Sequence, residues 1–214
     1  MPIIKPNLPR QLPSTESLLT LGPSRTLESC EIGHSAWAAQ TANRLQLDAV
    51  RLVEPDLTAA ILREGGWADV EVMGGQLAGL NLTGSSLRRV HLERARLSGA
   101  VFVETQLKDV AFEDAKLDLI NFRFANLSRV SFVRCQLIEA DFSGAKLAGV
   151  SFTGCDLTAA DFSGALLRQV DLRSSTLGSL KGIGGLKGAI ISSDQMIALL
   201  PEFTAALGVE VNNN

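Results

Sequence analysis

The 214-residue sequence contains no tyrosine, two tryptophans, two histidines and three cysteines. The histidines, His34 and His91, lie far apart and no Cys-x-x-Cys pair occurs, so the spacing typical of a zinc site is missing. An odd number of cysteines, Cys30, Cys135 and Cys155, argues against a disulfide framework. We therefore expect a protein that holds no metal and no cofactor.

An excess of one charge sign is also lacking. Lys and Arg number 20 against 23 Asp and Glu, which gives a formal net charge of −3. This balance disfavours a basic protein that binds nucleic acid directly, and it disfavours a strongly acidic solvated chain.

Long hydrophobic runs are absent. No apolar stretch approaches the roughly 18 residues that a membrane span needs. Residues 1–10 lack the charged-then-apolar order of a signal peptide. We expect a cytoplasmic protein without membrane contact, and the 46% hydrophobic content suffices for one core.

What the sequence does contain is an apolar residue at every fifth position. From Leu47 to Leu177 each member of this series is Leu, Phe, Val or Trp, with no insertion. Helices repeat every 3.6 residues and strands every two, so neither explains a period of five. The chain is predicted to turn a corner about every five residues. The register extends backwards through Leu27, Ile32, Trp37 and Ala42.

A period of twenty residues lies inside the period of five. Valine recurs at this spacing at Val50, Val70, Val90, Val110, Val130, Val150 and Val170. Phenylalanine does so in two series, Phe102, Phe122, Phe142 and Phe162, and Phe112, Phe132 and Phe152. Four pentapeptides therefore make one square coil, in which each series stacks in the core and the two phenylalanine series line opposite walls. Seven to eight coils spaced by about 4.8 Å would form a rod of roughly 35–40 Å.

A second inward position, two residues before each centre, holds mostly small residues such as Ala95, Ala140 and Ala160. Cys135 and Cys155 occupy it twenty residues apart, so their thiols should stack in the core. Buried thiols of this kind behave as small, unreactive hydrophobes.

The pentapeptides themselves carry a recognisable motif. Residues 140–144 (Ala-Asp-Phe-Ser-Gly) and 160–164 (Ala-Asp-Phe-Ser-Gly) fit the pattern A-(D/N)-(L/F)-x-x. In this motif the chain resembles the pentapeptide-repeat family over about three-quarters of its length. The resemblance implies an all-β solenoid, a right-handed quadrilateral parallel β-helix. The whole chain is also similar to a group of uncharacterised bacterial members of that family, many of them actinobacterial.

Three segments are expected: an N-terminal arm or cap at 1–24, the β-helix at 25–180 and a helical cap at 181–214. The arm is rich in proline and should pack partly on the first coil, with disorder of residues 1–13 as the alternative. The cap should begin at Ser192 or Ser193, divide at Pro201 and end at Gly208.

The expected cap carries an apolar stripe at helical spacing, formed by Met196, Leu199, Leu200, Phe203 and Leu207. One interpretation is that the stripe plugs the last coil. The alternative comes from the resemblance, because the C-terminal helices of quinolone-resistance pentapeptide proteins form a dimer interface. On that reading two copies join into a longer rod.

Residues for catalysis are missing from the pattern. No general acid and base are paired, and Asp141 and Asp161 belong to the side-chain ladder that the family builds along its wall. We predict that the protein is not an enzyme. Two surfaces remain for a partner: a basic stripe at Arg88, Arg89, Lys108 and Arg129, interrupted by Asp109, and an apolar patch at Leu119 and Phe124 with Val101 and Val103.

Two functions fit these features. The first is a rigid scaffold that binds an unidentified protein partner through one wall. The alternative is implied by the resemblance to the Qnr and Mfp types, which bind DNA gyrase as mimics of DNA and protect it from fluoroquinolones. The chain lacks the long loops of the Qnr type. Its near-neutral charge also departs from the negative field that mimicry of DNA needs.

Overall fold

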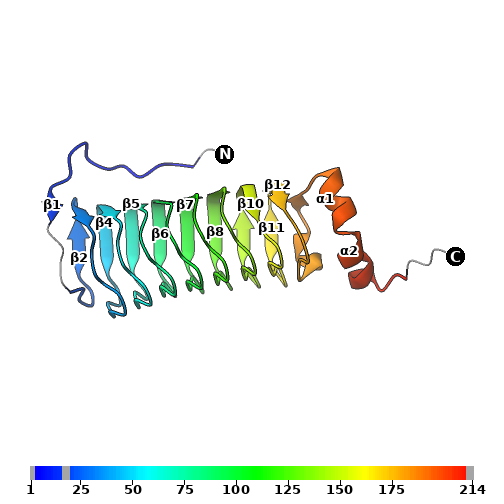
Figure 1. Ribbon diagram of the computed structural model, residues 1–214, viewed down its shortest axis with the longest axis horizontal. Helices are drawn as coiled ribbons and strands as arrows, with labels where there is room; N and C mark the ends of the chain where they lie inside the picture. Colours follow the sequence, from blue (N-terminus) through cyan, green and yellow to red (C-terminus); the bar gives the residue numbers. More distant parts are fainter. Residues whose placement is uncertain (1–2, 16–19, 211–214) are drawn as a thin grey trace.

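The computed structural model describes residues 3–15 and 20–210, and these form a straight rod with two short helices at one end (Figure 1). The rod is a right-handed quadrilateral parallel β-solenoid of about eight coils, as the sequence predicts. Its elements in chain order are β1 (Ser14–Thr15), β2 (Thr26–Glu28), β3 (Glu31–Gly33), β4 (Gln46–Val53), β5 (Gly66–Met73), β6 (Ser86–Glu93), β7 (Gln106–Glu113), β8 (Asn126–Val133), β9 (Lys146–Ala148), β10 (Ser151–Asp156), β11 (Leu166–Arg168), β12 (Val170–Thr176), η1 (Ile183–Leu186), β13 (Ala189–Ile190), α1 (Ser193–Ala198) and α2 (Leu200–Leu207).

Neighbouring coils pair in parallel with a register of twenty residues. Leu87 lies opposite Leu107, and Val90 lies opposite Val110. We name the four walls after the central residues of one coil: wall A on Phe102, wall B on Leu107, wall C on Phe112 and wall D on Leu117. The long strands β4 to β8 each cover walls B and C. Walls A and D are joined between coils by single bridges, such as Asn121 to Asp141 and Lys116 to Gln136.

Every corner of the coil needs a left-handed residue. From Ser24 to Gln169, each fifth residue has a positive φ, between about 47° and 73°. Some of these corners hold glycine, for which this conformation costs nothing, but most hold other residues. The corner turns the chain by one wall and leaves two side chains of each pentapeptide pointing inward.

The core consists of stacked side chains, with the two phenylalanine series facing each other across the tube. The Phe112 and Phe132 rings are parallel at 4.9 Å between centroids, and those of Phe132 and Phe152 at 4.8 Å. Phe132 meets Phe142 of the other series edge to face at 6.4 Å. The valine series from Val50 to Val170 is fully buried at the corner between walls B and C. Side chains of one type thus repeat at the spacing of the coils.

Cys135 and Cys155 lie in the core one coil apart. The Cys155 thiol and burial both raise the pKa of the Cys135 thiol. Sγ of Cys135 lies 3.4 Å from the carbonyl oxygen of Phe112. The pair therefore occupies core space and offers no accessible thiolate.

The N-terminal arm covers the first coil and then continues along the rod. β1 pairs in parallel with β3, so it protects the open edge of the first coil. Residues 3–13 run back along the outside of the rod towards β8 (Figure 1). The sequence analysis placed the arm on the first coil. In the structure the arm reaches well beyond that coil. The expected disorder of residues 1–2 lies outside the described residues.

The C-terminal cap closes the other end. Ser192 is the N-cap of α1 and exchanges hydrogen bonds with Gln195, while Gly208 ends α2 with a left-handed backbone. The amide of Gln195 also donates to the carbonyl oxygens of Leu172 and Ser175, both at 2.6 Å, which satisfies the edge of the last coil. Leu199 is completely buried against that coil.

The rest of the predicted apolar stripe lies outside the plug. Phe203 is partly buried against the core, whereas Met196, Leu200 and Leu207 are exposed. Within this stripe Leu199 forms the plug and the exposed residues form an apolar outer face. Val211 of the expected extended tail lies outside the described residues.

The stacked phenylalanines should dominate the stability of the rod. We expect Phe132→Ala to lower the free energy of unfolding by about 3 kcal/mol or more, because it opens a cavity between two stacked rings. Phe124→Ala is the matched control, since Phe124 is exposed, and should change the value by no more than about 0.5 kcal/mol. Denaturant unfolding followed by circular dichroism measures both. Equal effects of the two substitutions would contradict the assignment of the core.

Candidate interaction surfaces

Charged side chains on the corner between walls B and C pair from one coil to the next. Arg129 holds Asp109 with two hydrogen bonds, Nε to Oδ1 at 2.6 Å and Nη2 to Oδ2 at 2.5 Å. Arg89 holds Asp69 in the same way, with Nε to Oδ1 at 2.6 Å. Each arginine follows its aspartate by twenty residues, which places it one coil further along. This corner is a column of alternating charges.

These pairs are sheltered enough to shift the ionisation of the carboxylates. The Arg129 guanidinium holds the pKa of Asp109 below its usual range, and the backbone N–H of Ile4 adds to the effect. The Arg89 guanidinium lowers the pKa of Asp69, and the N–H of Asn7 does so too. Both carboxylates are buried. They therefore remain ionised well below neutral pH.

The basic stripe expected on wall B is shorter than the sequence suggested. Arg89 and Arg129 belong to the ion pairs just described, so their charges are neutralised locally. Arg88 and Lys108 are exposed on this wall. Sequence reasoning missed the pairing, although opposite charges twenty residues apart are its signal.

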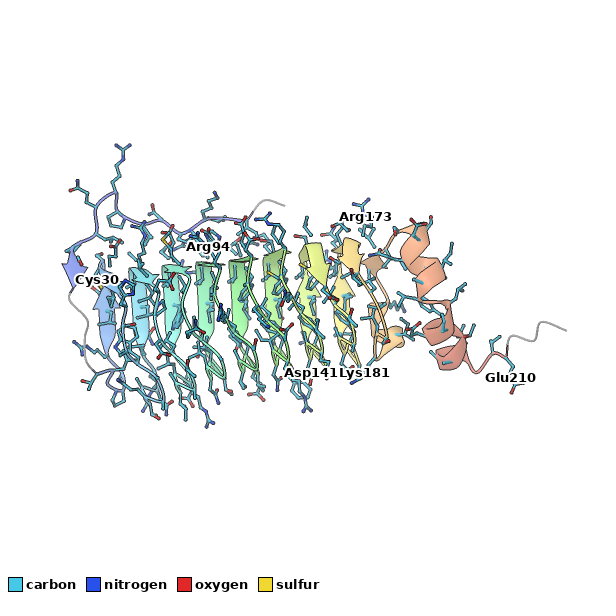
Figure 2. The ribbon with its side chains drawn as sticks, viewed as in Figure 1. Cys30, Arg94, Asp141, Arg173, Lys181 and Glu210 are labelled. Carbon is cyan, nitrogen blue, oxygen red and sulfur yellow. The ribbon has the colours of Figure 1, made fainter. Side chains whose placement is uncertain are left out.

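Wall C shows the same neutralisation. Arg51 bridges Glu31 at 3.1 Å and Glu71 at 2.9 Å, and so links three successive coils. Arg134 pairs with Asp114 at 2.7 Å and with Glu113 at 2.6 Å. Figure 2 shows charged side chains on opposite sides of the rod, with Arg94 and Arg173 along one edge and Asp141 and Lys181 along the other. The surface is mixed in charge, and these walls do not form a continuous acidic face.

Two large apolar side chains stand out on the two corners that border wall A, Leu119 between walls D and A and Phe124 between walls A and B. Leu119 is 59% exposed and Phe124 is 58% exposed. The Arg123 guanidinium lies 5.5 Å from the centre of the Phe124 ring, and Arg123 also approaches Asp141 at 3.8 Å. Val101 and Val103 on wall A are half-buried. We call Leu119 and Phe124 the apolar corner.

Glycine in the following coil makes room for the apolar corner. A Cβ atom added at Gly144 would lie only 2.6 Å from the Phe124 ring. Gly144 also has a φ of 67°, which favours glycine by itself. The Phe124 ring therefore lies flat along the rod, over the backbone of the next coil.

A third surface lies at the C-terminal end. An apolar groove of about 470 Å³ separates the last turns of the rod from α2, and its lining includes Ile183, Leu186, Ile191, Phe203 and Leu207. Gly185 permits the tight packing of η1 there, since a Cβ atom would lie 1.8 Å from the carbonyl oxygen of Phe162. Leu207, one of the exposed side chains of α2, lines this groove.

Comparison with known proteins identifies the family. The profile described as "Pentapeptide repeat region" matches residues 67–142 and 105–181, which together exceed half of the chain. The chain belongs to the pentapeptide-repeat family. No curated protein matches this pentapeptide-repeat protein significantly in sequence.

Solved structures agree in fold. A trypsin-treated variant of QnrB1, described as a plasmid-mediated fluoroquinolone resistance protein, matches at 17% identity and a TM-score of 0.51, covering 93% of this chain and all of that one. HetL from the cyanobacterium Nostoc sp. strain PCC 7120, described as involved in heterocyst differentiation regulation, matches at 23% identity with a TM-score of 0.28. The match covers 80% of this chain and 91% of HetL. At 17% identity the likeness to QnrB1 is one of fold alone.

The metal-binding potential of this pentapeptide-repeat protein was assessed from the side chains that the structure describes. Across residues 3–15 and 20–210, no three His, Cys, Asp or Glu side chains are placed to hold a metal ion. His91 lies 3.5 Å from Glu113 on wall C. In the same ranges no helix is long and apolar enough to cross a lipid bilayer. What the described surface offers is shape, apolar contact and paired charge.

The paired charges should make stability depend on pH. A carboxylate whose pKa is lowered by folding stabilises the protein at pH values above the ordinary aspartate pKa, about 3.9, and this contribution is lost as the pH falls through the lowered value. Arg129→Gln removes the guanidinium that lowers the pKa of Asp109. We expect it to lower the thermal midpoint at pH 7, with the difference from wild type shrinking towards pH 2.

Arg134→Gln is the matched control for this experiment. It removes the same kind of pair from an exposed corner, where solvent screens the charges, and should have a smaller effect at pH 7. Thermal unfolding of the three proteins between pH 7 and pH 2 provides the test. A loss in Arg129→Gln that persists unchanged at pH 2 would show that the ion pair is not its cause.

Proposed function

We propose that this protein is a non-enzymatic interaction scaffold that binds a partner protein through the apolar corner. The observation that carries this proposal is that Leu119 and Phe124 combine exposure with a left-handed backbone. Both have a φ of 58°. Among the described non-glycine residues with positive φ, they alone carry large apolar side chains.

Folding gives no reason for large apolar residues at these positions. The left-handed conformation costs a residue with a Cβ atom roughly 1–2 kcal/mol. The other corners hold glycine, alanine or polar and charged residues. An exposed leucine or phenylalanine at such a corner recovers little free energy from burial within the chain. Contact with a second molecule would recover it.

The surroundings of the apolar corner suit a protein interface. Phe124 lies flat on the rod beside the Arg123 guanidinium, and aromatic and arginine side chains commonly dominate the binding energy of interfaces. Asp141 is close by and would help to orient a polar rim. The solenoid beneath is held by registered coils and stacked rings, so little order has to be gained on binding.

The experiment compares three full-length proteins as bait in cell extract: wild type, Phe124→Glu and Leu166→Glu. Leu166 is the control because it is equally exposed but lies on wall B. We expect a captured protein that is retained by wild type and Leu166→Glu and lost with Phe124→Glu. With that protein purified, calorimetry should give an affinity loss of at least about tenfold for Phe124→Glu. Equal capture by all three would refute the role of the apolar corner.

A second candidate function is binding to DNA gyrase. Its support is the likeness in fold to the fluoroquinolone resistance protein QnrB1 along 93% of this chain. The exposed apolar side chains of Met196, Leu200 and Leu207 would suit pairing of two copies into a longer rod. The ion pairs along walls B and C weigh against it, since neutralised charges give a weak negative field.

Gyrase supercoiling with and without a fluoroquinolone tests this second candidate. Binding would appear as inhibition of supercoiling, or as relief of drug inhibition, at low micromolar concentrations of folded protein. On the charge distribution described above, we expect neither effect. A clear effect in either arm would favour gyrase as the partner over an unrelated protein.

A further inference from the structure

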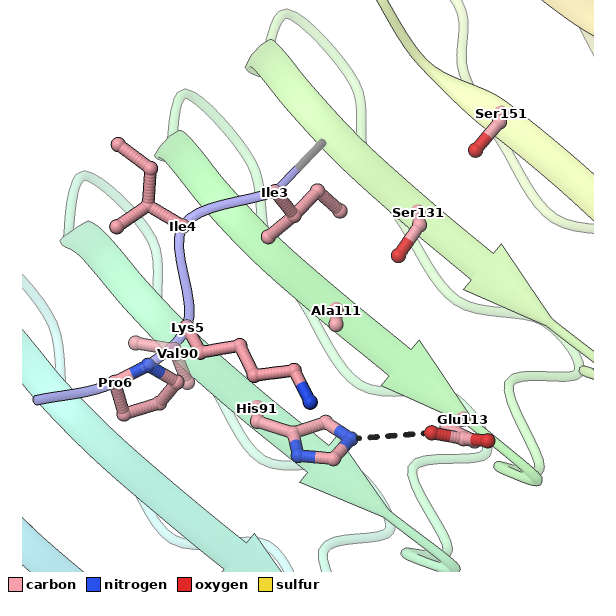
Figure 3. A pocket seen from close by; sticks show the side chains of 10 residues that line it. All are labelled: Ile3, Ile4, Lys5, Pro6, Val90, His91, Ala111, Glu113, Ser131 and Ser151. Atoms are coloured by element: carbon pink, nitrogen blue, oxygen red, sulfur yellow. Dashed lines mark ion pairs between the residues drawn. The ribbon is translucent and has the colours of Figure 1, made fainter. Parts of the chain in front are cut away.

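The N-terminal arm is bound to the rod in the manner of a peptide ligand. Figure 3 shows residues 3–6 running across β6 and β7 towards β8 on the outside of the rod. The backbone N–H of Asn7 donates to Oδ1 of Asp69 at 2.8 Å. The backbone N–H of Ile4 faces Asp109 and helps to lower the pKa of that carboxylate. Both acceptors belong to the column of ion pairs on the corner between walls B and C.

The spacing of these contacts matches the rod. Asp69 and Asp109 are forty residues, or two coils, apart, which is about 9.6 Å at the usual strand spacing. Ile4 and Asn7 are three residues apart. Three residues of an extended, proline-type chain advance about 9.3 Å. Three residues of the peptide therefore span two coils, so N–H groups three residues apart reach the carboxylates of Asp109 and Asp69 without strain.

The first side chains of the arm are spaced in the same way. Ile3 and Pro6 are half-buried against the rod, whereas Ile4, Lys5 and Asn7 are exposed. Beyond them the spacing changes, because Leu8 is half-buried and Pro9 is exposed. On wall C the column beside residues 3–6 begins with His91 and continues with the small residues Ala111 and Ser131 at the next two coils. The small side chains leave a channel into which Ile3 extends.

The acceptors are fixed before any peptide arrives. Arg89 and Arg129 hold the two carboxylates from the neighbouring coils with paired hydrogen bonds. Each carboxylate keeps capacity for a further donor, which the arm supplies. Because the carboxylates are buried and ionised, a main-chain N–H is a favourable partner for them.

The arm does not fill the channel. A groove of about 390 Å³ remains beside residues 3–6, and its lining continues past Ile3 to Ser131 and Ser151. Most side chains of residues 3–13 are exposed, so few contacts hold the segment in place. Segments with few buried contacts open at low cost in free energy. The channel is therefore longer than its occupant, and the occupant is replaceable.

We propose that the corner between walls B and C is a binding track for an extended, proline-containing segment of a partner protein, for which residues 3–9 are an internal competitor. The ligand presents an aliphatic residue and a proline three positions apart. Its main-chain N–H groups, also three positions apart, donate to Asp109 and Asp69. The track lies one wall away from the corner of Phe124 and two walls away from that of Leu119, and it shares no residue with the apolar corner, so it is a second site that stands or falls independently of the proposed function.

The experiment uses the full-length chain with residues 3–9 replaced by a Gly-Ser segment of equal length. This replacement removes the competing side chains and keeps the rod and β1. The probe is a fluorescent, end-capped peptide with the sequence of residues 3–9. Fluorescence anisotropy should show that the probe binds the replaced protein at least tenfold more tightly than wild type, because the tethered arm competes at a high effective concentration.

Variants in the replaced background locate the site. Asp109→Ala should weaken binding of the probe at least tenfold. Asp114→Ala is the matched control, because it removes the aspartate of a similar arginine pair on the neighbouring corner, and should leave binding unchanged. A probe methylated on the backbone nitrogens of Ile4 and Asn7 should not bind. Phe124→Glu should have no effect, which separates this track from the apolar corner.

Two results would overturn the proposal. One is the absence of probe binding to the replaced protein when circular dichroism shows that it is folded, or equal binding to Asp109→Ala and Asp114→Ala. The other is a concentration-dependent dimer of the wild-type protein that disappears when residues 3–9 are replaced. That outcome would assign the track to the arm of a second copy.

Discussion

A left-handed residue at every fifth position is the constraint on which this structure depends. It turns the chain by one wall, and four such turns bring it back above its starting point, one strand spacing further along. Residues twenty apart are then neighbours in space along most of the rod. The stacked rings of Phe112, Phe132 and Phe152 and the column of buried valines follow from this single geometric fact. So does the pairing of charges between coils.

The pairing of charges shapes what the surface is able to do. A rod with unpaired acidic side chains would project a long-range negative field, as a mimic of DNA requires. Here Arg51, Arg89, Arg129 and Arg134 each reach a carboxylate one coil away, so the charges cancel over short distances. Recognition by such a surface relies on close contact and on specific side chains. The apolar corner and the track under the arm are both of this kind.

The two candidate sites use the repeat in different ways. The apolar corner departs from it, because Leu119 and Phe124 are single exceptions at corners otherwise held by small or polar residues. The track depends on it, because Asp69 and Asp109 recur at a fixed interval that an extended peptide is able to match. A solenoid therefore offers both a site that occurs once and a surface whose features repeat from coil to coil. The sites lie on different corners of the coil and share no residue, so one partner need not exclude another.

Much of the fold was readable from the sequence because the repeat is local and periodic. The series from Leu47 to Leu177 predicted the coil, and the motif at residues 140–144 predicted the family. Ser192, Pro201 and Gly208 marked the limits of the two helices through ordinary capping chemistry. The five-residue register also predicted that the side chains of Leu119 and Phe124 point outward. The left-handed corners were missed, although glycine is frequent at that position.

Other features arose only in the tertiary structure. The amide of Gln195 meets the last coil, and the N–H groups of Ile4 and Asn7 meet Asp109 and Asp69. These contacts occur once and join segments far apart in the chain, so no periodic pattern in the sequence predicts them. The charge pairs were predictable only in part. Their spacing of twenty residues is visible in the sequence, but the geometry that neutralises Arg89 and Arg129 is not. The sequence by itself determined the coil and its core, because stacking repeats one local rule. Only the folded chain decided which charges are neutralised and where the arm lies, because those depend on single contacts between distant residues.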